Sequence, residues 1–236
     1  MIRALLTGVS ALALCGLTLA RDRSAHGDHG TTIFHRIDIE TSFTDRDGGI
    51  IDWDMQGWVG GDVERVWLRS EGEIEDGDVH SAEAQIFYAW NFHDFWDVVV
   101  GLRHDFEPDG RTYAAAGVVG MLPYFIETEA TVFLSEDGDL TARFKHEIDI
   151  RLTQDLILEP HLELNLAAQD DASRGIGAGI TDAEASLQLR YEIAREVAPF
   201  VEVAWERKMG ETASIARATG DDVEETSVRI GLNVWF

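Results

Sequence analysis

Apolar and polar residues alternate with a period of two along most of the chain beyond about position 33. The clearest stretch is the C-terminal end, where every second residue is apolar and polar or small residues lie between: Val228, Ile230, Leu232, Val234 and Phe236 against Arg229, Gly231 and Asn233. A period of two places successive side chains on opposite faces of a β-strand. The pattern therefore predicts an all-β chain whose strands each carry one apolar face.

The expected strands are long. Soluble strands usually have about 5–6 residues, whereas a strand that crosses a bilayer at a tilt needs about 9–11. About twelve segments of this kind are expected, and an even number is typical of a bacterial transmembrane barrel. They lie at 33–43, 50–59, 63–73, 82–92, 95–106, 112–121, 124–134, 140–152, 156–168, 182–193, 200–208 and 225–236.

The expected connections alternate in kind. Those after even-numbered strands are very short, and those after odd-numbered strands are mostly longer and acidic or glycine-rich, as at 73–81, 169–181 and 209–224. Short periplasmic turns and longer outer loops produce this alternation in outer-membrane barrels. A soluble sandwich has no reason to sort its loops in this way. We therefore expect a transmembrane, antiparallel, up-and-down β-barrel of about 12 strands with both termini in the periplasm.

Aromatic residues cluster toward the ends of the expected strands, where such side chains form girdles at the membrane interface. Their expected lipid-facing members are Trp53, Trp90, Trp96, Tyr113, Tyr124, Tyr191, Trp205 and Phe236. An ordinary core position stays open for any one of them.

The first residues have the features of a secretory signal peptide: Arg3, then an apolar stretch over 4–20, then an abrupt change to polar sequence. Leu14 precedes Cys15 where a lipoprotein signal needs a small residue, which disfavours lipidation. The expected organisation is a signal peptide over 1–20, a short His-containing periplasmic tail over 21–32, and the outer-membrane barrel over 33–236.

Composition narrows the function. The chain carries 19 Lys and Arg against 44 Asp and Glu, for a formal net charge of −25. Nucleic-acid binding needs clustered basic residues, so this class is excluded. The single Cys excludes an internal disulfide and a cysteine-based zinc site.

Several ordered strings resemble the copper resistance protein B (CopB/PcoB type) family. They are Gly60-Gly61-Asp62 with Val66–Glu73, Phe95-Trp96-Asp97, Val100–Phe106, Leu122–Phe125, Leu152-Thr153-Gln154, Leu158-Glu159-Pro160, Leu162–Asn165, Arg174–Gly177, Leu189–Ile193, Ala198–Val201 and Trp205–Lys208. The resemblance covers about 33–236. It implies an outer-membrane barrel of bacterial copper tolerance that works beside periplasmic copper-resistance proteins. The expected function is to bind copper ions or pass them across the outer membrane.

One departure from the family concerns the segment before the barrel. Members often carry a Met- and His-rich segment there, and here only 21–32 remains, with two histidines and no methionine. We therefore expect this chain to lack a large periplasmic copper-collecting region and high-capacity copper binding.

Two sets of residues are candidate copper ligands. His26, His29 and His35 lie in or beside the tail, where imidazoles suit Cu(II). Adventitious binding by a solvated tail is the alternative. The second set is Glu159, His161 and Glu163, which share the inward face of one strand. A hydrogen-bonded wall without metal is the alternative there.

The inward face carries both signs of charge. Two interpretations stay open: an ion-paired network that fills a modest lumen, or an electronegative conduit that concentrates cations. Asp170-Asp171 and Asp221-Asp222 lie in expected outer loops, where divalent cations that bridge lipopolysaccharide phosphates are one possibility and plain solvation is the other. A generic narrow pore or structural barrel is the alternative to the copper role. An outer-membrane hydrolase is a third possibility, but no nucleophile motif accompanies His161, so we expect no enzymatic activity.

Overall fold

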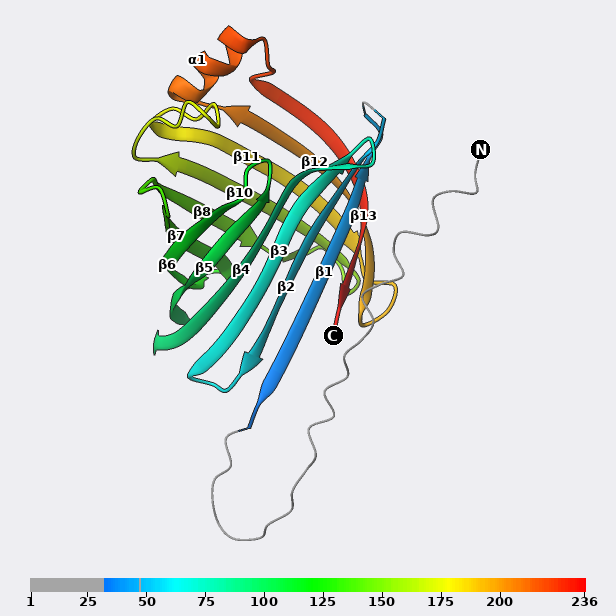
Figure 1. Cartoon of the computed structure of the whole chain (residues 1–236). Coiled ribbons are helices and arrows are strands. Elements are labelled where there is room, and N and C mark those ends of the chain that lie inside the picture. The colour runs from blue at the N-terminus through cyan, green and yellow to red at the C-terminus, as the bar shows by residue number, and fades with distance from the viewer. Residues whose placement is uncertain (1–31, 47) are drawn as a thin grey trace. The chain divides into compact units, whose positions relative to one another are not determined.

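The structure is a computed structural model that describes residues 32–46 and 48–236. These residues form a closed antiparallel ring of strands (Figure 1). The elements are β1 (Phe34–Thr44), β2 (Ile50–Gly60), β3 (Glu64–Glu75), β4 (Asp78–His93), β5 (Trp96–Glu107), β6 (Arg111–Leu122), β7 (Ile126–Ser135), β8 (Leu140–Ile148), β9 (Ile150–Arg151), β10 (Leu156–Ala167), β11 (Gly179–Tyr191), β12 (Val197–Lys208), α1 (Gly210–Thr219) and β13 (Glu224–Trp235).

The ring has twelve strands because β9 continues β8 beyond Asp149 and both pair with β10. Each strand pairs with its sequence neighbours, and β1 pairs with β13 to close the barrel. The last residue joins this seam, since Phe236 and Ile37 exchange backbone hydrogen bonds of 2.9 and 3.1 Å. The predicted up-and-down barrel of about 12 strands is confirmed.

Alternation along the strands gives the barrel an apolar outside. Large apolar side chains such as Leu68, Val100 and Ile230 are exposed on the outer surface. Charged residues at the intervening positions, such as Glu83, Asp105 and Glu202, are buried in the lumen. No helix among the described residues is long and apolar enough to span a membrane.

The expected loop over 73–81 is wrong. β3 runs to Glu75 and β4 begins at Asp78, so only Asp76 and Gly77 connect them. Both have positive φ, 52° and 92°, which is the backbone of a tight hairpin turn in which Asp-Gly is a favoured pair. The two longest connections are 168–178 and 209–223, and α1 in the latter lies against β11 and β12 (Figure 1).

One expected girdle residue faces the other way. Tyr113 is 3% exposed and belongs to an apolar cluster inside the barrel with Phe87, Val99 and Phe133. Trp90, Tyr124, Tyr191 and Phe236 are exposed, as expected for the outer surface. The inside of this barrel is therefore not uniformly polar.

Candidate functional site

The lumen contains a cavity of about 470 Å³. Acidic side chains dominate its wall: twelve carboxylates face five Arg and Lys side chains and one imidazole. The acids are Glu40, Asp52, Asp54, Glu71, Glu73, Glu83, Asp105, Glu107, Glu163, Glu184, Glu202 and Glu206; the others are Arg103, Arg143, Lys145, Arg174, Arg229 and His161. A concave wall with one prevailing sign of charge concentrates ions of the opposite sign.

The lumen wall formed by β3 to β8, here called the aromatic wall, is packed with rings and guanidinium groups. Arg69 lies over the rings of Trp67 and Phe87, with its Cζ 5.3 and 5.5 Å from their centroids. Arg103 and Arg143 lie over Phe133 at 5.1 and 5.9 Å. Cation–π contacts strengthen when they are shielded from water, so these rings fix the guanidiniums in place.

Ion pairs link this wall across the lumen. Lys145 Nζ lies 3.2 Å from Glu71 and 3.1 Å from Glu163, and Arg143 pairs with Glu71, Glu83 and Glu163. Glu71 is on β3 and Arg143 is on β8, five strands apart in a ring of twelve, so their contact crosses the barrel. This network matches the predicted ion-paired filling of the lumen.

The opposite side, formed by β1, β2 and β10 to β13 and here called the acidic wall, has fewer basic residues. Glu40 accepts hydrogen bonds from the Gln188 and Asn233 amides at 3.0 and 3.2 Å instead of an ion pair. Six carboxylates that line the cavity form no ion pair with Arg or Lys within 32–46 and 48–236. Four of them lie on this wall (Glu40, Asp52, Asp54 and Glu206), and the other two, Glu73 and Glu107, lie near the ends of β3 and β5. Most of the unpaired carboxylates therefore lie on the acidic wall, as the electronegative interpretation predicts.

The connection at 168–178 reaches into this cavity. Arg174 donates hydrogen bonds to the Tyr113 hydroxyl and to Asp105 Oδ2, the latter at 3.1 Å. At the base of the loop, Asp171 accepts hydrogen bonds from the Ser173 hydroxyl at 2.5 Å and from Arg111 at 2.8 Å. The Ser173 hydroxyl first and Arg111 second hold the pKa of the Asp171 carboxyl below its ordinary value. These contacts anchor the loop at the cavity mouth.

Of the three predicted tail ligands, only His35 lies among the described residues. His26 and His29 lie outside the described residues, as do the signal peptide at 1–20 and nearly all of the tail at 21–32. His35 is on β1, exposed, opposite Val59 on β2. The structure does not bring His35 together with any acidic residue into a cluster of metal-ligand atoms.

The predicted lumen ligands do share one face of β10, but their side chains separate. Glu159 pairs with Arg190, and Glu163 pairs with Lys145 and Arg143 and accepts a hydrogen bond from Asn165. His161 lines the cavity. The ligand atoms of the three residues do not converge, so their role as a copper site stays a prediction.

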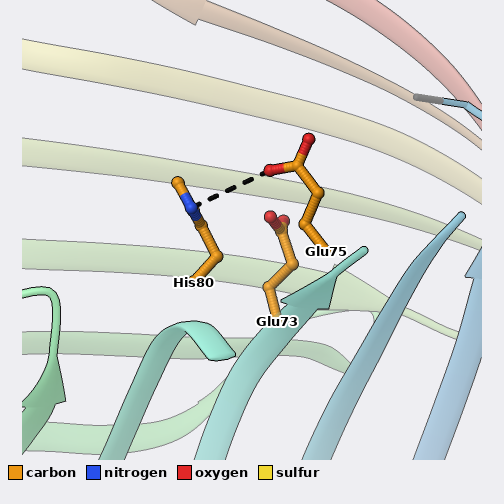
Figure 2. A group of neighbouring side chains, drawn as sticks. All are labelled: Glu73, Glu75 and His80. Carbon is orange, nitrogen blue, oxygen red and sulfur yellow. Dashed lines mark ion pairs between the residues drawn. The ribbon is translucent and has the colours of Figure 1, made fainter. Parts of the chain in front are cut away.

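Another group does converge. In the described part of the chain, the one set of at least three His, Cys, Asp or Glu residues whose ligand atoms all lie within 4.8 Å of one another is Glu73, Glu75 and His80 (Figure 2). The sequence pattern did not predict this group, because 73–81 was expected to be a loop. The Asp76-Gly77 pair, a strong hairpin signal between two alternating segments, was the available clue.

The barrel resembles solved porin structures. It superposes on the NanC porin with a TM-score of 0.56 at 14% identity, covering 84% of this chain and 98% of that one. The KdgM porin gives a TM-score of 0.50 at 12% identity, covering 85% and 99%. With its apolar exterior and charged lumen, the chain is a bacterial outer-membrane β-barrel.

Sequence comparison identifies the family. The family model "Copper resistance protein B precursor (CopB)" matches residues 32–236. Copper resistance protein B of Escherichia coli is 43% identical over 185 residues, 78% of this chain and 62% of the relative. A copper resistance protein B homolog of Pseudomonas syringae pv. tomato is 42% identical over 191 residues, 80% and 65%. This chain thus belongs to the copper resistance protein B family, and it spans just under two thirds of the length of these curated relatives.

Proposed function

We propose that this barrel serves copper resistance by drawing copper cations into its acidic lumen, where it binds them or passes them across the outer membrane. The observation that carries the proposal is the cavity wall, in which twelve carboxylates face five Arg and Lys residues. Six of those carboxylates have no Arg or Lys ion pair in the described chain, so their charge is available to a mobile cation. Family membership supplies the choice of copper.

The protein has no catalytic role in this proposal; copper is the ion that it handles. Copper-resistance proteins of the periplasm would exchange copper with the barrel, and outer-membrane lipid and lipopolysaccharide surround it. The tail histidines, His26 and His29, together with His35, are proposed as accessory ligands on the periplasmic side.

The experiment is copper survival of a strain that lacks this gene. We expect the deletion to lower copper tolerance and the wild-type gene to restore it. A form in which His26, His29 and His35 are replaced by Ala tests the tail alone. Unchanged tolerance in the deletion strain contradicts the copper role, whereas equal rescue by both forms removes only the contribution of these histidines.

A structural barrel or a narrow pore without a copper role is the second candidate. The ion pairs that cross the lumen from Glu71 to Arg143 and Lys145 favour it, because they close part of the channel. The two candidates differ in metal specificity. The copper role predicts that deletion sensitises the cell to copper, and the structural role predicts equal sensitivity to detergents and to unrelated metals.

A further inference from the structure

The hairpin between β3 and β4 brings two carboxylates to the same face. Glu73 and Glu75 are two residues apart on β3, so the strand alternation gives their side chains one direction. That direction is the lumen, since Glu73 lines the cavity. The tight turn at Asp76-Gly77 keeps the ends of both strands paired up to Glu75 and Asp78. Both acids are therefore held on paired backbone at the rim of the barrel.

A β-bulge adds an imidazole to these carboxylates. Ser81 lies opposite Glu73 and Val79 lies opposite Ile74, so His80 is an extra residue on β4. A bulge shifts the alternation and redirects a side chain. His80 Nδ1 lies 3.8 Å from a Glu75 carboxylate oxygen, and Figure 2 shows the imidazole and both carboxylates turned toward one another.

The charge of this group is not balanced by the protein. Within the described residues neither Glu73 nor Glu75 forms an ion pair with Arg or Lys. Glu71, two residues before Glu73 on β3, pairs with both Arg143 and Lys145. Asp52 lies opposite Glu73 on β2 and adds another negative charge nearby. Two ionised carboxylates carry a charge of −2, which one bound divalent cation balances.

Access and spacing suit an ion that arrives from solvent. The His80 side chain is 69% exposed and that of Glu75 is 37% exposed. Divalent metals bind imidazole and carboxylate at about 2.0–2.2 Å, so two ligands of one ion lie at most about 4.4 Å apart. Ligand atoms within 4.8 Å of one another need only small side-chain movements to reach this spacing.

We propose that Glu73, Glu75 and His80 form a binding site for one Cu(II) ion at the outer rim of the lumen, the first contact for copper that enters from outside. The choice of copper rests on the proposed function. Imidazole nitrogen and carboxylate oxygen suit Cu(II), whereas Cu(I) prefers thiolate and thioether ligands, and Cu(II) binds such sites more tightly than the other first-row divalent ions.

Cu(II) titration of the full-length protein in detergent, followed by electron paramagnetic resonance and calorimetry, tests this site. His80→Gln is expected to lose one equivalent of bound Cu(II) together with one nitrogen-coupled signal. Glu73→Gln with Glu75→Gln is expected to weaken the same equivalent at least tenfold and to leave the other equivalents unchanged. His93→Gln is the matched control, because His93 is an exposed histidine on the same strand at its opposite end, where its ring contacts the Asp94 carbonyl.

Equal copper binding by His80→Gln and His93→Gln would overturn the site. Heat-modifiable migration on gels verifies that each variant forms the barrel. The result is independent of the copper survival experiment. A sensitive deletion strain with unchanged binding by His80→Gln rejects the rim site and keeps the proposed function. An insensitive deletion strain with binding lost in His80→Gln keeps the site and rejects the function.

Discussion

The aromatic wall and the acidic wall face each other in one lumen, but they differ in how far their charged side chains form ion pairs. On the aromatic wall each of Arg69, Arg103 and Arg143 stacks on a ring and pairs with at least one carboxylate, so cations and acids are both held in place. On the acidic wall, Asp54 and Glu206 line the cavity without an Arg or Lys ion pair in the described chain. Under the proposed function, the paired charges of the aromatic wall stabilise the barrel. The unpaired carboxylates, on the acidic wall and at the β3–β4 rim, interact with ions.

The largest expected effect is loss of the guanidinium shared by the most acids. Arg143→Ala leaves Glu71, Glu83 and Glu163 without one partner in a poorly solvated region, and breaking such a buried pair costs about 3–5 kcal/mol. Urea unfolding followed by tryptophan fluorescence measures the change. The control is Arg207→Ala, whose exposed pair with Glu224 at 3.8 Å is worth about 0–1 kcal/mol. Equal stability of the two variants would contradict a stabilising role for this wall.

A smaller effect is expected from the rings beneath the guanidiniums. Phe133 is 2% exposed and lies under both Arg103 and Arg143. Phe133→Leu keeps most of the apolar volume but removes the π face, and we expect a loss of about 1–2 kcal/mol in the same unfolding assay. Phe92→Leu, on an exposed outer position, is the control. No difference between them would show that packing alone, without the cation–π contacts, holds this wall.

The acidic wall predicts a kinetic effect with little change in stability. Asp54→Asn with Glu206→Gln removes two unpaired charges from the cavity and should slow Cu(II) association about two- to tenfold at low salt. Stopped-flow quenching of tryptophan fluorescence by Cu(II) measures the rate. The difference should shrink as salt rises, since the screening length falls from about 30 Å at 0.01 M to about 10 Å at 0.1 M. Glu127→Gln, outside the cavity lining, is the control; if it slows association equally, the cavity has no special role.

The smallest expected effect is on the loop at 168–178. The pKa of Asp171 lies below its ordinary value of 3.8, so its contacts with Ser173 and Arg111 stabilise the loop at pH above about 4. This contribution is lost as the pH falls through the lowered pKa. Limited proteolysis of the loop should therefore quicken modestly at low pH in the wild type. Asp171→Asn should be cleaved faster already at neutral pH and show a flatter pH profile; an unchanged profile would contradict this anchor.

Much of the barrel was accessible from the sequence because a period of two is a local property. The alternation that ends at Phe236 predicted β13, and each of the other expected strands overlaps one that the structure contains. The lumen charges followed from the same parity, since the positions opposite apolar ones must face inward in a closed barrel. Strand ends were less certain, and the Asp76-Gly77 turn was overlooked within an acidic stretch.

Contacts between distant strands had no signal in the sequence. Which acids are neutralised depends on which strands face each other across the ring, so Glu71 on β3 meets Arg143 on β8 only after closure. Tyr113 follows an apolar parity in the sequence but lies inside, because part of the lumen is itself apolar. Glu159, His161 and Glu163 share a face as expected, but ion pairs from other strands separate their side chains.

The sequence by itself determined the class of fold, the number of strands, the family and the excess of acid, because these depend on local alternation, ordered strings and composition. The tertiary structure decided where that acid is unpaired and which ligands meet. His80 illustrates the difference. Strict alternation on β4 separates it from Glu73 and Glu75, and a single extra residue in the β3–β4 ladder turns it toward them. A bulge arises from the register between two strands, which neither strand encodes alone.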